Sequence, residues 1–367
     1  MRSVIAIAAG GTGGHVIPAI AVAEALREER PELECIFIGT GQELEHKLVK
    51  ASGFDLVVLP ALPFVGGGVL GKLRYLLYLP MGLFMASKLL VERKVDAVLG
   101  FGGYPSVMPS LAAKLLRKPL FIHEQNVAAG AANKLLGLLA KIVFAVPGAR
   151  GFLRKNNLVY FGNPVRKSFT LAPKWEAPSA DISIKLLVTG GSQGAVSLNS
   201  AVISLLDRLE EEAELKDRVE LLHQVGNRDF DRVAAIYRER GRGRFRAVPF
   251  VEDMASAYAD CDLVISRAGA MTVAEILASK RPAVFVPLPI AGGHQARNVE
   301  KLAEVGACKM LPQDEQLEQN LSDLVISLLR SPAQLEEMVD AMSDLVELDP
   351  CMAAERISKR ILENLCD

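Results

Sequence analysis

One opening unit occurs twice in this chain of 367 residues, and it restricts the possible folds more than any other feature. The apolar run Val4–Ala9 leads into the glycine-rich segment Gly10–Gly14, and the run Ile184–Val188 leads into Gly190–Gly194. A stretch of helical length follows each glycine-rich segment. A strand, a glycine-rich turn and a helix in this order open a Rossmann-like half. The repeat therefore predicts two Rossmann-like domains that face each other across a cleft.

Short apolar runs alternate with helix-length amphipathic segments along the rest of the chain. This rhythm indicates parallel strands covered on both faces, which is an α/β fold. We expect further strands at Cys35–Ile38, Leu56–Leu59, Ala97–Leu99, Leu120–Ile122, Ile142–Ala145, Val219–His223, Leu263–Ser266 and Ala283–Pro287. The domains are predicted to span residues 1–166 and 167–344, followed by a C-terminal helix within 345–367. Segment Phe169–Ser183 has no periodicity and is interpreted as an interdomain linker.

Composition excludes several classes of protein. With 50% hydrophobic and 23% charged residues, the chain is neither disordered nor collagen-like. A net charge of −1 gives no reason to expect a nucleic-acid partner. The five cysteines form no C-x-x-C pair, which indicates a reducing compartment and no zinc or disulfide framework. The most apolar stretch, residues 75–87, contains Pro80 and is shorter than the roughly 20 residues that span a bilayer.

Charge is distributed unevenly along the chain. Residues 1–166 carry 19 Lys/Arg and 11 Asp/Glu, whereas residues 167–367 carry 23 and 32, so the first half is basic and the second acidic. Within the first half, segment 72–94 combines several basic residues with many apolar ones. This segment is either a core helix or a surface patch that binds anionic lipid headgroups.

The two glycine-rich turns are candidate anion sites, because free backbone N–H groups and the positive end of a helix point at the ligand. Either turn could also be only a tight joint between strand and helix. A dinucleotide cofactor is not expected, since Gly39–Gln42, after the second strand, contains no acid for a ribose. The acidic pairs Asp229/Asp231 and Asp260/Asp262 do not follow strands, so we expect no metal site.

Polar residues at other predicted strand ends are candidates for chemistry. His15 either has its hydrogen bonds satisfied by the backbone or acts as a base. The second interpretation is possible because a helix N-terminus disfavours imidazolium and leaves the ring neutral. His123–Asn126 follows a buried strand, where open α/β sheets place their sites. Thr272 and Glu275 fit a capping box, or Glu275 accepts the hydroxyls of a ribose. Gln295 either caps a helix or binds sugar hydroxyls.

These motifs in this order resemble the MurG family of bacterial peripheral-membrane glycosyltransferases. The resemblance rests on seven blocks, Gly10–His15, Gly100–Ser106, His123–Asn126, Gly162–Arg166, Gly190–Ala195, Ala270–Glu275 and Gln295–Asn298. It implies an inverting, metal-independent enzyme without cofactor. Such an enzyme moves N-acetylglucosamine from UDP-N-acetylglucosamine to the 4-hydroxyl of the muramyl sugar of lipid I, forming lipid II for peptidoglycan synthesis, cell shape and cell division.

The resemblance also implies a GT-B fold and a set of site residues. The first domain would bind the acceptor and the membrane, the second the UDP-sugar, and the C-terminal helix would pack back on the first domain. His15 corresponds to the family's favoured catalytic residue, with His123 and Glu124 as reserve bases. The implied UDP-N-acetylglucosamine contacts are Thr12, Gly13, Gly14, Asn126, Arg166, Ser192, Val251, Ala270, Met271, Thr272, Val273, Ala274, Glu275 and Gln295. Gly293 stands where the family usually has Asp.

The implied location is the cytoplasmic face of the bacterial plasma membrane, where segment 72–94 would dock and other cell-wall synthesis proteins would be partners. Three other interpretations remain. A GT-B enzyme with another lipid acceptor shares the donor site, but block Gly100–Asn126 argues against it. A UDP-sugar epimerase would need further acid–base groups and no membrane patch. A nucleotide-sensing or dehydrogenase-like module would lack the second glycine turn or need an acid after the second strand.

Overall fold

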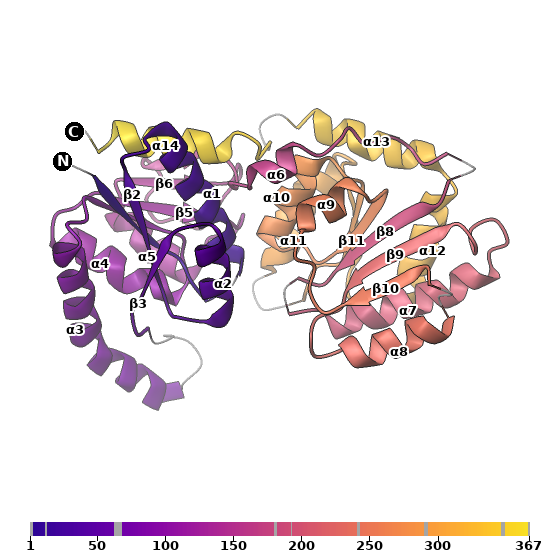
Figure 1. The fold of residues 1–367 in the computed structure, drawn as a ribbon, viewed down its shortest axis with the longest axis horizontal. Helices are drawn as coiled ribbons and strands as arrows, with labels where there is room; N and C mark the ends of the chain where they lie inside the picture. Colours follow the sequence, from indigo (N-terminus) through magenta and orange to yellow (C-terminus); the bar gives the residue numbers. More distant parts are fainter. Residues whose placement is uncertain are drawn as a thin grey trace. The chain divides into compact units, whose positions relative to one another are not determined.

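The computed structural model describes residues 3–11, 13–61, 68–179, 182–191, 193–240, 243–289, 293–345 and 349–365, with the backbone alone for 68–77. The chain divides into two compact units. The first unit comprises Met1–Arg166 and Leu348–Asp367, and the second comprises Lys167–Glu347. Each unit is an α/β domain with a parallel sheet, so the predicted fold class is confirmed (Figure 1).

The first unit contains a seven-stranded parallel sheet in the order β3-β2-β1-β4-β5-β6-β7. Its elements are β1 (Val4–Ala8), α1 (Gly13–Glu29), β2 (Glu34–Gly39), α2 (Glu43–Ala51), β3 (Asp55–Val58), α3 (Gly68–Glu92), β4 (Ala97–Gly100), η1 (Tyr104–Ser106), α4 (Val107–Leu115), β5 (Leu120–Glu124), α5 (Ala131–Leu139), β6 (Ile142–Ala145), β7 (Leu158–Tyr160) and α14 (Ala353–Glu363).

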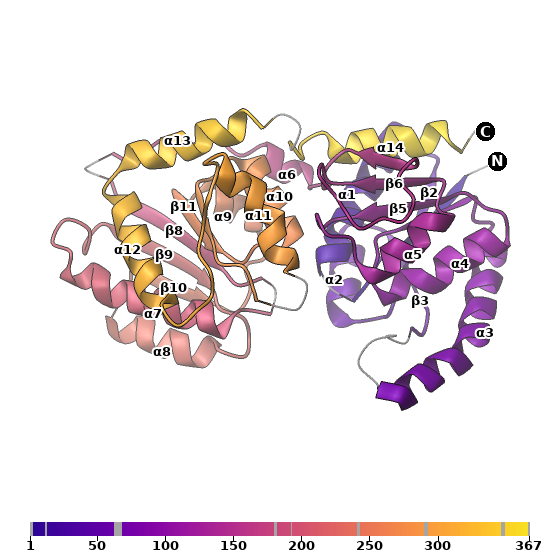
Figure 2. The ribbon, with the colours of Figure 1, turned by 180° about the vertical axis from the view of Figure 1, so that it is seen from behind.

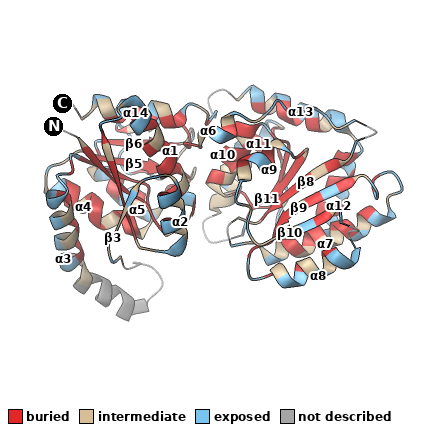
Figure 3. Ribbon diagram, in the orientation of Figure 1, coloured by how far each residue is buried: buried red, intermediate tan, exposed pale blue. Residues whose placement is uncertain are grey.

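Two apolar layers form the core of this unit, one on each face of the sheet. Side chains alternate along β1, so Ile5 and Ile7 enter one layer and Val4 and Ala6 the other. All five residues of β1 are buried, which explains why its sequence is continuously apolar. Helix α14 packs on α1 and contributes Ile357 to the first layer. Figure 3 shows the buried strands between helices whose outer faces are exposed.

Helix α3 has two different faces in its described half. Ala86 and Leu90 are fully buried in the core, whereas Met81, Phe84 and Val91 are exposed. The helix packs beside α4 (Figure 2). Among the described residues, no helix is both long and apolar enough to cross a membrane. The core-helix interpretation of segment 72–94 therefore holds for the buried face, and the other face carries exposed apolar side chains.

The second unit repeats the same architecture. Its six-stranded parallel sheet has the order β10-β9-β8-β11-β12-β13, which matches that of the first sheet from β3 to β6. Its elements are α6 (Lys167–Thr170), β8 (Ile184–Thr189), α7 (Val196–Glu211), β9 (Val219–Gln224), α8 (Phe230–Arg240), β10 (Phe245–Val248), α9 (Met254–Ala259), β11 (Leu263–Ser266), α10 (Ala270–Ser279), β12 (Ala283–Phe285), α11 (His294–Glu304), β13 (Lys309–Met310), α12 (Leu317–Leu329) and α13 (Pro332–Ser343). The order reverses at the first strand of each sheet, where such folds bind ligands.

The interpretation of Phe169–Ser183 as a linker is wrong for much of its length. Phe169 and Trp175 are buried in the second unit. The indole Nε1 of Trp175 donates to the Asp262 carbonyl (3.0 Å), and the buried guanidinium of Arg281 donates to the Pro173 carbonyl (2.9 Å). After α6 the segment has no regular secondary structure, which is why it lacks periodicity, and two buried aromatic residues anchor it to the unit.

Candidate functional site

A buried carboxylate holds the first glycine turn in place. Glu45, on α2, is 2% exposed. It accepts hydrogen bonds from the backbone N–H groups of Gly11 (2.6 Å), Thr40 (2.7 Å) and Gly41 (2.8 Å), and from the Thr40 hydroxyl (2.6 Å). It therefore ties the turn after β1 to the turn after β2. The Gly11 N–H is already occupied, so an anion at this turn must use the N–H groups further along. Thr12 lies outside the described residues.

Hydrogen bonding decides the charge of Glu45. Burial acts to raise the pKa of this carboxyl, but the four donors from Thr40, Gly11 and Gly41 outweigh burial, and its pKa lies below the ordinary value. Glu45 is consequently an anion at neutral pH, and the turn is built around it.

His15 stands in the first turn of α1, directly after this glycine turn. Burial lowers the pKa of its imidazole, and the nearby charge of Glu124 and a hydrogen bond to the Gly10 backbone oppose this effect without cancelling it. Gly103 packs against the ring, since a Cβ at Gly103 would lie 3.2 Å from Cε1 of His15. The imidazole is thus neutral at neutral pH and able to accept a proton.

A pocket of about 630 Å³ opens beside His15 in the first unit. Its lining includes the polar residues His15, Tyr104, Glu124, Gln125, Asn126 and Asn133, together with apolar side chains of α4 and α5. The predicted residues His15, Glu124 and Asn126 are therefore brought to one cavity, at the carboxyl edge of the sheet. A pocket with convergent polar groups and apolar walls is typical of a ligand site.

Glu124 is fully engaged as a hydrogen-bond acceptor. Its Oε1 accepts from the backbone N–H (2.9 Å) and the side-chain amide (3.2 Å) of Asn126. Its Oε2 accepts from the Gly130 N–H (2.9 Å) and from Nδ2 of Asn133 (2.9 Å). With four donors around it, Glu124 is suited to holding the Asn126–Gly130 loop and to stabilising a charged His15, and poorly suited to be the reserve base that we expected.

His123 is not in the pocket, and its assignment as a reserve base is wrong. Strand β5 continues to Glu124, two residues further than predicted, so His123 is still part of the strand and points to the opposite face from Glu124. It is completely buried, with its ring nitrogens 3.1 Å from the Gly162 carbonyl oxygen and 3.1 Å from Nε2 of Gln125. Burial lowers the pKa of His123 to about 4.

The second glycine turn is fixed by a different residue. Gln224, at the end of β9, donates from Nε2 to the Gly191 carbonyl (2.9 Å) and accepts at Oε1 from the Val251 N–H (2.8 Å). It thus connects the turn after β8 to the loop that contains the predicted nucleotide contact Val251. Because the Val251 N–H is used, its carbonyl is the backbone group left for a ligand. Ser192 lies outside the described residues.

The start of α10 does not form the capping box that we considered. The helix begins at Ala270 with Gly269 as its N-cap, so Thr272 is the third helical residue. The N-terminal turns of α10 hold Met271, Val273 and Ala274, which are buried, and Thr272, which is half-buried. Glu275 is 7% exposed.

The residue before helix α11, which carries Gln295, has a left-handed backbone conformation. Gly293 caps α11 with φ +57°, a conformation that glycine adopts without strain. The carbonyl oxygen of the Gln295 side chain accepts from the Leu288 N–H (2.9 Å), which ties the loop after β12 to α11. Of the other predicted contacts, Gly13 and Gly14 lie in the first turn of α1, and Arg166 is half-buried at the end of the first unit.

The acidic residues that could suggest a metal have protein partners. Asp229 binds Arg232 (2.7 Å) and Asn199 (2.8 Å). Asp260 pairs with the Lys185 ammonium (2.6 Å), and Asp262 accepts from the Lys185 N–H (2.7 Å). Across the described ranges, no group of three or more His, Cys, Asp or Glu side chains is arranged to hold a metal ion.

Sequence reasoning missed Glu45, Gln224 and Arg267. Gln224 ends a buried strand, so the same criterion that selected His123–Asn126 would have found it. Arg267 directly follows the buried strand β11 and meets the same criterion, whereas Glu45 gave no comparable signal. Arg267 is 5% exposed, donates to the Val286 carbonyl (2.9 Å), Ser197 (2.8 Å) and Gln313 (2.6 Å), and has a pKa lowered by burial.

Comparisons with known proteins agree with this description. The N-terminal domain model of glycosyltransferase family 28 matches residues 5–145, and its C-terminal domain model matches 185–350. The chain is 38% identical to the UDP-N-acetylglucosamine–N-acetylmuramyl-(pentapeptide) pyrophosphoryl-undecaprenol N-acetylglucosamine transferase of Syntrophotalea carbinolica, over 98% of both chains. It superposes on the crystal structure of Acinetobacter baumannii MurG with a TM-score of 0.76 and 32% identity, over 99% of this chain and 100% of that one.

A putative UDP-N-acetylglucosamine 2-epimerase of Listeria monocytogenes gives a TM-score of 0.73 over 99% of this chain and 96% of that one, but only 16% identity, so it shares the fold alone. The chain matches the transferases along almost its whole length, and it contains the repeated sheet, the two glycine turns and the His15 pocket. The chain belongs to glycosyltransferase family 28 and, within it, to the MurG family of N-acetylglucosaminyltransferases.

Proposed function

We propose that this enzyme transfers N-acetylglucosamine from UDP-N-acetylglucosamine to the 4-hydroxyl of the muramyl sugar of lipid I, forming lipid II and UDP. The observation that carries the proposal is His15, a neutral imidazole in a ligand-sized pocket, in a chain of this family. The first unit binds the acceptor in that pocket. The second unit binds the donor at its glycine turn and α10.

His15 acts as the general base. It takes the proton from the acceptor hydroxyl while the hydroxyl oxygen attacks the anomeric carbon from the face opposite UDP. The bond from that carbon to the UDP oxygen breaks, and UDP leaves with its bonding electrons, so the configuration inverts. Glu124 stabilises the imidazolium that forms, because its charge acts on His15 already in the ground state.

Most of the proposed donor contacts belong to the second unit. Ser192 and the N-terminus of α7 hold the diphosphate with Arg166, since helix N-termini stabilise anions. The uracil binds the Val251 carbonyl and the backbone at Ala270. Thr272 and its neighbours bind phosphate and Glu275 the ribose, while the Gln295 amide binds the transferred sugar. Gln224 supports this assignment, because its two hydrogen bonds fix the distance between the glycine turn and the loop that contains Val251.

Membrane binding is peripheral and uses α3, on the cytoplasmic side where UDP-sugars are made. Met81, Phe84 and Val91, at successive spacings of three and seven residues, lie on one face of α3 and are 59%, 65% and 58% exposed. Lys88 lies on the same face and binds Glu92 (3.6 Å). An amphipathic face of this kind inserts between headgroups and keeps the acceptor's lipid tail in the bilayer.

Transfer of labelled N-acetylglucosamine to a lipid I analogue, with EDTA present, tests the proposal. Wild-type enzyme should form product despite EDTA, because Asp229, Asp260 and Asp262 are bound to protein groups instead of a metal. His15→Ala should lose about 100-fold or more in kcat and retain UDP binding. UDP-sugar binding without transfer to any lipid I analogue would refute the acceptor assignment, and absence of donor binding would refute the whole proposal.

A further inference from the structure

A chain of buried polar side chains lies next to the second glycine turn. His223 in β9, Asn199 in α7 and Tyr237 in α8 are 0%, 0% and 2% exposed. The Tyr237 hydroxyl lies 2.6 Å from Nδ1 of His223, and Nε2 of His223 lies 3.1 Å from Oδ1 of Asn199. Nδ2 of Asn199 donates to the Val225 carbonyl (3.1 Å) and to Oδ2 of Asp229 (2.8 Å). One strand and two helices are thereby joined at the Val225 carbonyl.

The hydrogen-bond partners determine the protonation of His223. Because both amide hydrogens of Asn199 go to oxygen acceptors, its Oδ1 must accept, and Nε2 of the imidazole carries the hydrogen. Nδ1 then accepts from the Tyr237 hydroxyl. Burial lowers the pKa of His223 to about 3, and the charge of Asp229 opposes this effect without cancelling it. His223 is therefore a neutral ring that connects two partners and is too deeply buried to touch a substrate.

The Val225 carbonyl packs against the backbone of the glycine turn. A Cβ on Gly194 would lie 2.0 Å from the Val225 carbonyl oxygen, and one on Gly226 would lie 2.4 Å from the Gln193 carbonyl oxygen. The two segments therefore touch backbone to backbone, with no side chain between them to absorb a shift. A displacement of Val225 must move Gly194, whose N–H closes the turn by donating to the Gly191 carbonyl (3.0 Å).

The last two residues of β9 act on the turn from opposite faces of the sheet, because side chains alternate along a strand. Gln224 donates to the Gly191 carbonyl, whereas His223 acts at Gly194 through Asn199. Apolar side chains of similar volume would fill the position of His223 at least as stably, but they would not direct a hydrogen bond. A polar network at this depth therefore contributes geometry more than stability.

We infer that His223 is a positioning residue for the donor diphosphate. Through Asn199 and the Val225 carbonyl, it sets where the second glycine turn presents its N–H groups. The inference rests on the proposed function, which assigns the diphosphate to this turn and the uracil to the loop of Val251. It deepens that function, because it separates the support of the diphosphate from the support of the nucleoside.

Calorimetric titration with UDP and with uridine tests the inference. In His223→Leu, which removes the donor to Asn199, affinity for UDP should fall about tenfold, as expected when a buried hydrogen-bonding group loses its partner. Affinity for uridine should change less than about twofold, since uridine has no diphosphate to meet the turn. His223→Gln should keep UDP affinity within about threefold, because its amide can still donate to Asn199. If His223→Leu does not fold, Tyr237→Phe, which keeps the ring, should still weaken UDP binding about threefold.

Leu335→Ala is the matched control for stability. Leu335 is completely buried in α13 of the same unit, and Figure 1 shows α13 and α8 on opposite sides of that unit. The control should lower the unfolding temperature and leave both affinities unchanged, with all variants titrated at a temperature at which they are folded. Equal losses of UDP and uridine affinity in His223→Leu, or an equal loss of UDP affinity in Leu335→Ala, would overturn the inference.

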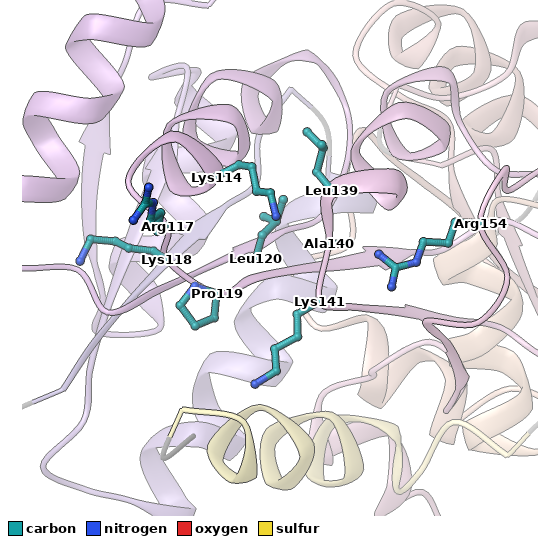
Figure 4. A pocket seen from close by; sticks show the side chains of 9 residues that line it. All are labelled: Lys114, Arg117, Lys118, Pro119, Leu120, Leu139, Ala140, Lys141 and Arg154. Carbon is teal, nitrogen blue, oxygen red and sulfur yellow. The ribbon is translucent and has the colours of Figure 1, made fainter.

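A second place in the protein attracts anions and needs its own control. The basic residues Lys114, Arg117, Lys118, Lys141 and Arg154 line a pocket of about 640 Å³ in the first unit (Figure 4). Arg117→Gln/Arg154→Gln should leave UDP affinity unchanged, because the proposed diphosphate site is the second glycine turn. Loss of UDP binding in this variant would overturn the proposed donor site together with the inference. Unchanged UDP affinity in His223→Leu would overturn the inference alone.

Discussion

At the scale of single residues, the most informative contrast is between His123 and Glu124. Both follow an apolar run and are chemically reactive, yet they face opposite sides of the sheet because β5 continues through them. The sequence indicates that polar residues gather at this strand end. It does not fix the residue at which the strand stops, and side chains alternate with a period of two. An error of two residues in the strand boundary thus made a buried histidine look like a candidate base.

Glu45→Gln should loosen the first glycine turn. An amide presents N–H hydrogens to the donors of Thr40 and Gly41 and removes the charge, so we expect a loss of about 2–3 kcal/mol in unfolding free energy and a roughly tenfold lower kcat. Denaturant unfolding and transfer rates measure the two effects. Glu43→Gln, on the same helix but exposed, is the control and should change neither.

The pH dependence of wild-type stability checks the charge of Glu45. Its folded pKa is depressed, so its stabilising contribution is complete above the unfolded pKa, near 4.5, and is lost as pH falls through the folded value. Glu45→Gln should lack this acid-dependent loss. If stability depended on pH in the variant as it does in the wild type, Glu45 would not be the charged group that holds the first glycine turn.

The pH profile of kcat/KM should report His15 in the free enzyme. Because burial lowers the pKa of His15 below 6.5, its base form persists to more acidic pH, and kcat/KM should fall with acid only below pH 6.5. A fall in kcat/KM that begins above pH 6.5 would show that the Glu124 charge outweighs burial in setting the pKa of His15. Because the folded pKa is the lower one, protonation of the unfolded chain also reduces stability as pH falls below 6.5.

At the scale of elements, the two glycine turns were recognisable from sequence, and of the residues that brace them Gln224 met the strand-end criterion whereas Glu45 did not. Gln224 reaches the Gly191 carbonyl 33 residues away, and Glu45 reaches the Gly11 N–H 34 residues away. These contacts join segments far apart in the chain, which local spacing does not encode. The glycines themselves follow from backbone geometry, and this can be tested at the second turn.

Gly194→Ala should disrupt the second turn, whereas Gly191→Ala should be tolerated. Both glycines have positive φ, +72° and +83°, so both substitutions carry a strain of about 1 kcal/mol. The two positions differ in the room available for a Cβ atom. A Cβ at Gly194 would lie 2.0 Å from the Val225 carbonyl oxygen, and one at Gly191 would meet nothing within 4 Å. UDP binding by calorimetry should fail for the first variant and persist for the second. Similar affinities for both would disprove the steric argument.

At the scale of the whole molecule, the repeated architecture was predictable because buried parallel strands are continuously apolar and each unit opens with a strand followed by a glycine-rich turn. The course of segment 169–183 was not, since its anchors Phe169 and Trp175 are two isolated side chains without a pattern. The contribution of the chain's last helix to the first unit is likewise a product of tertiary packing, carried by the completely buried Ile357 and Ile361.

Ile357→Ala should destabilise the first unit by about 2–4 kcal/mol, because it leaves a cavity between α14 and α1. The second unit should keep its stability, so calorimetry should show one transition at a lower temperature and the other unchanged. Arg356→Ala, at the exposed neighbouring position, is the control. A uniform shift of both transitions would mean that the units unfold as one.

The return of the chain to the first unit has a consequence for biosynthesis. The second unit is continuous from Lys167 to Glu347, whereas the first is split around it and needs α14 to complete its core. At translation rates of about 5–20 residues per second, α14 emerges roughly 10–40 s after Arg166. Limited proteolysis of ribosome-bound chains that end before α14 should therefore cut the first unit faster than the second. The half of the protein that is made first is the half that matures last, and in the interval its unfinished apolar face depends on chaperones or on the ribosome surface for protection.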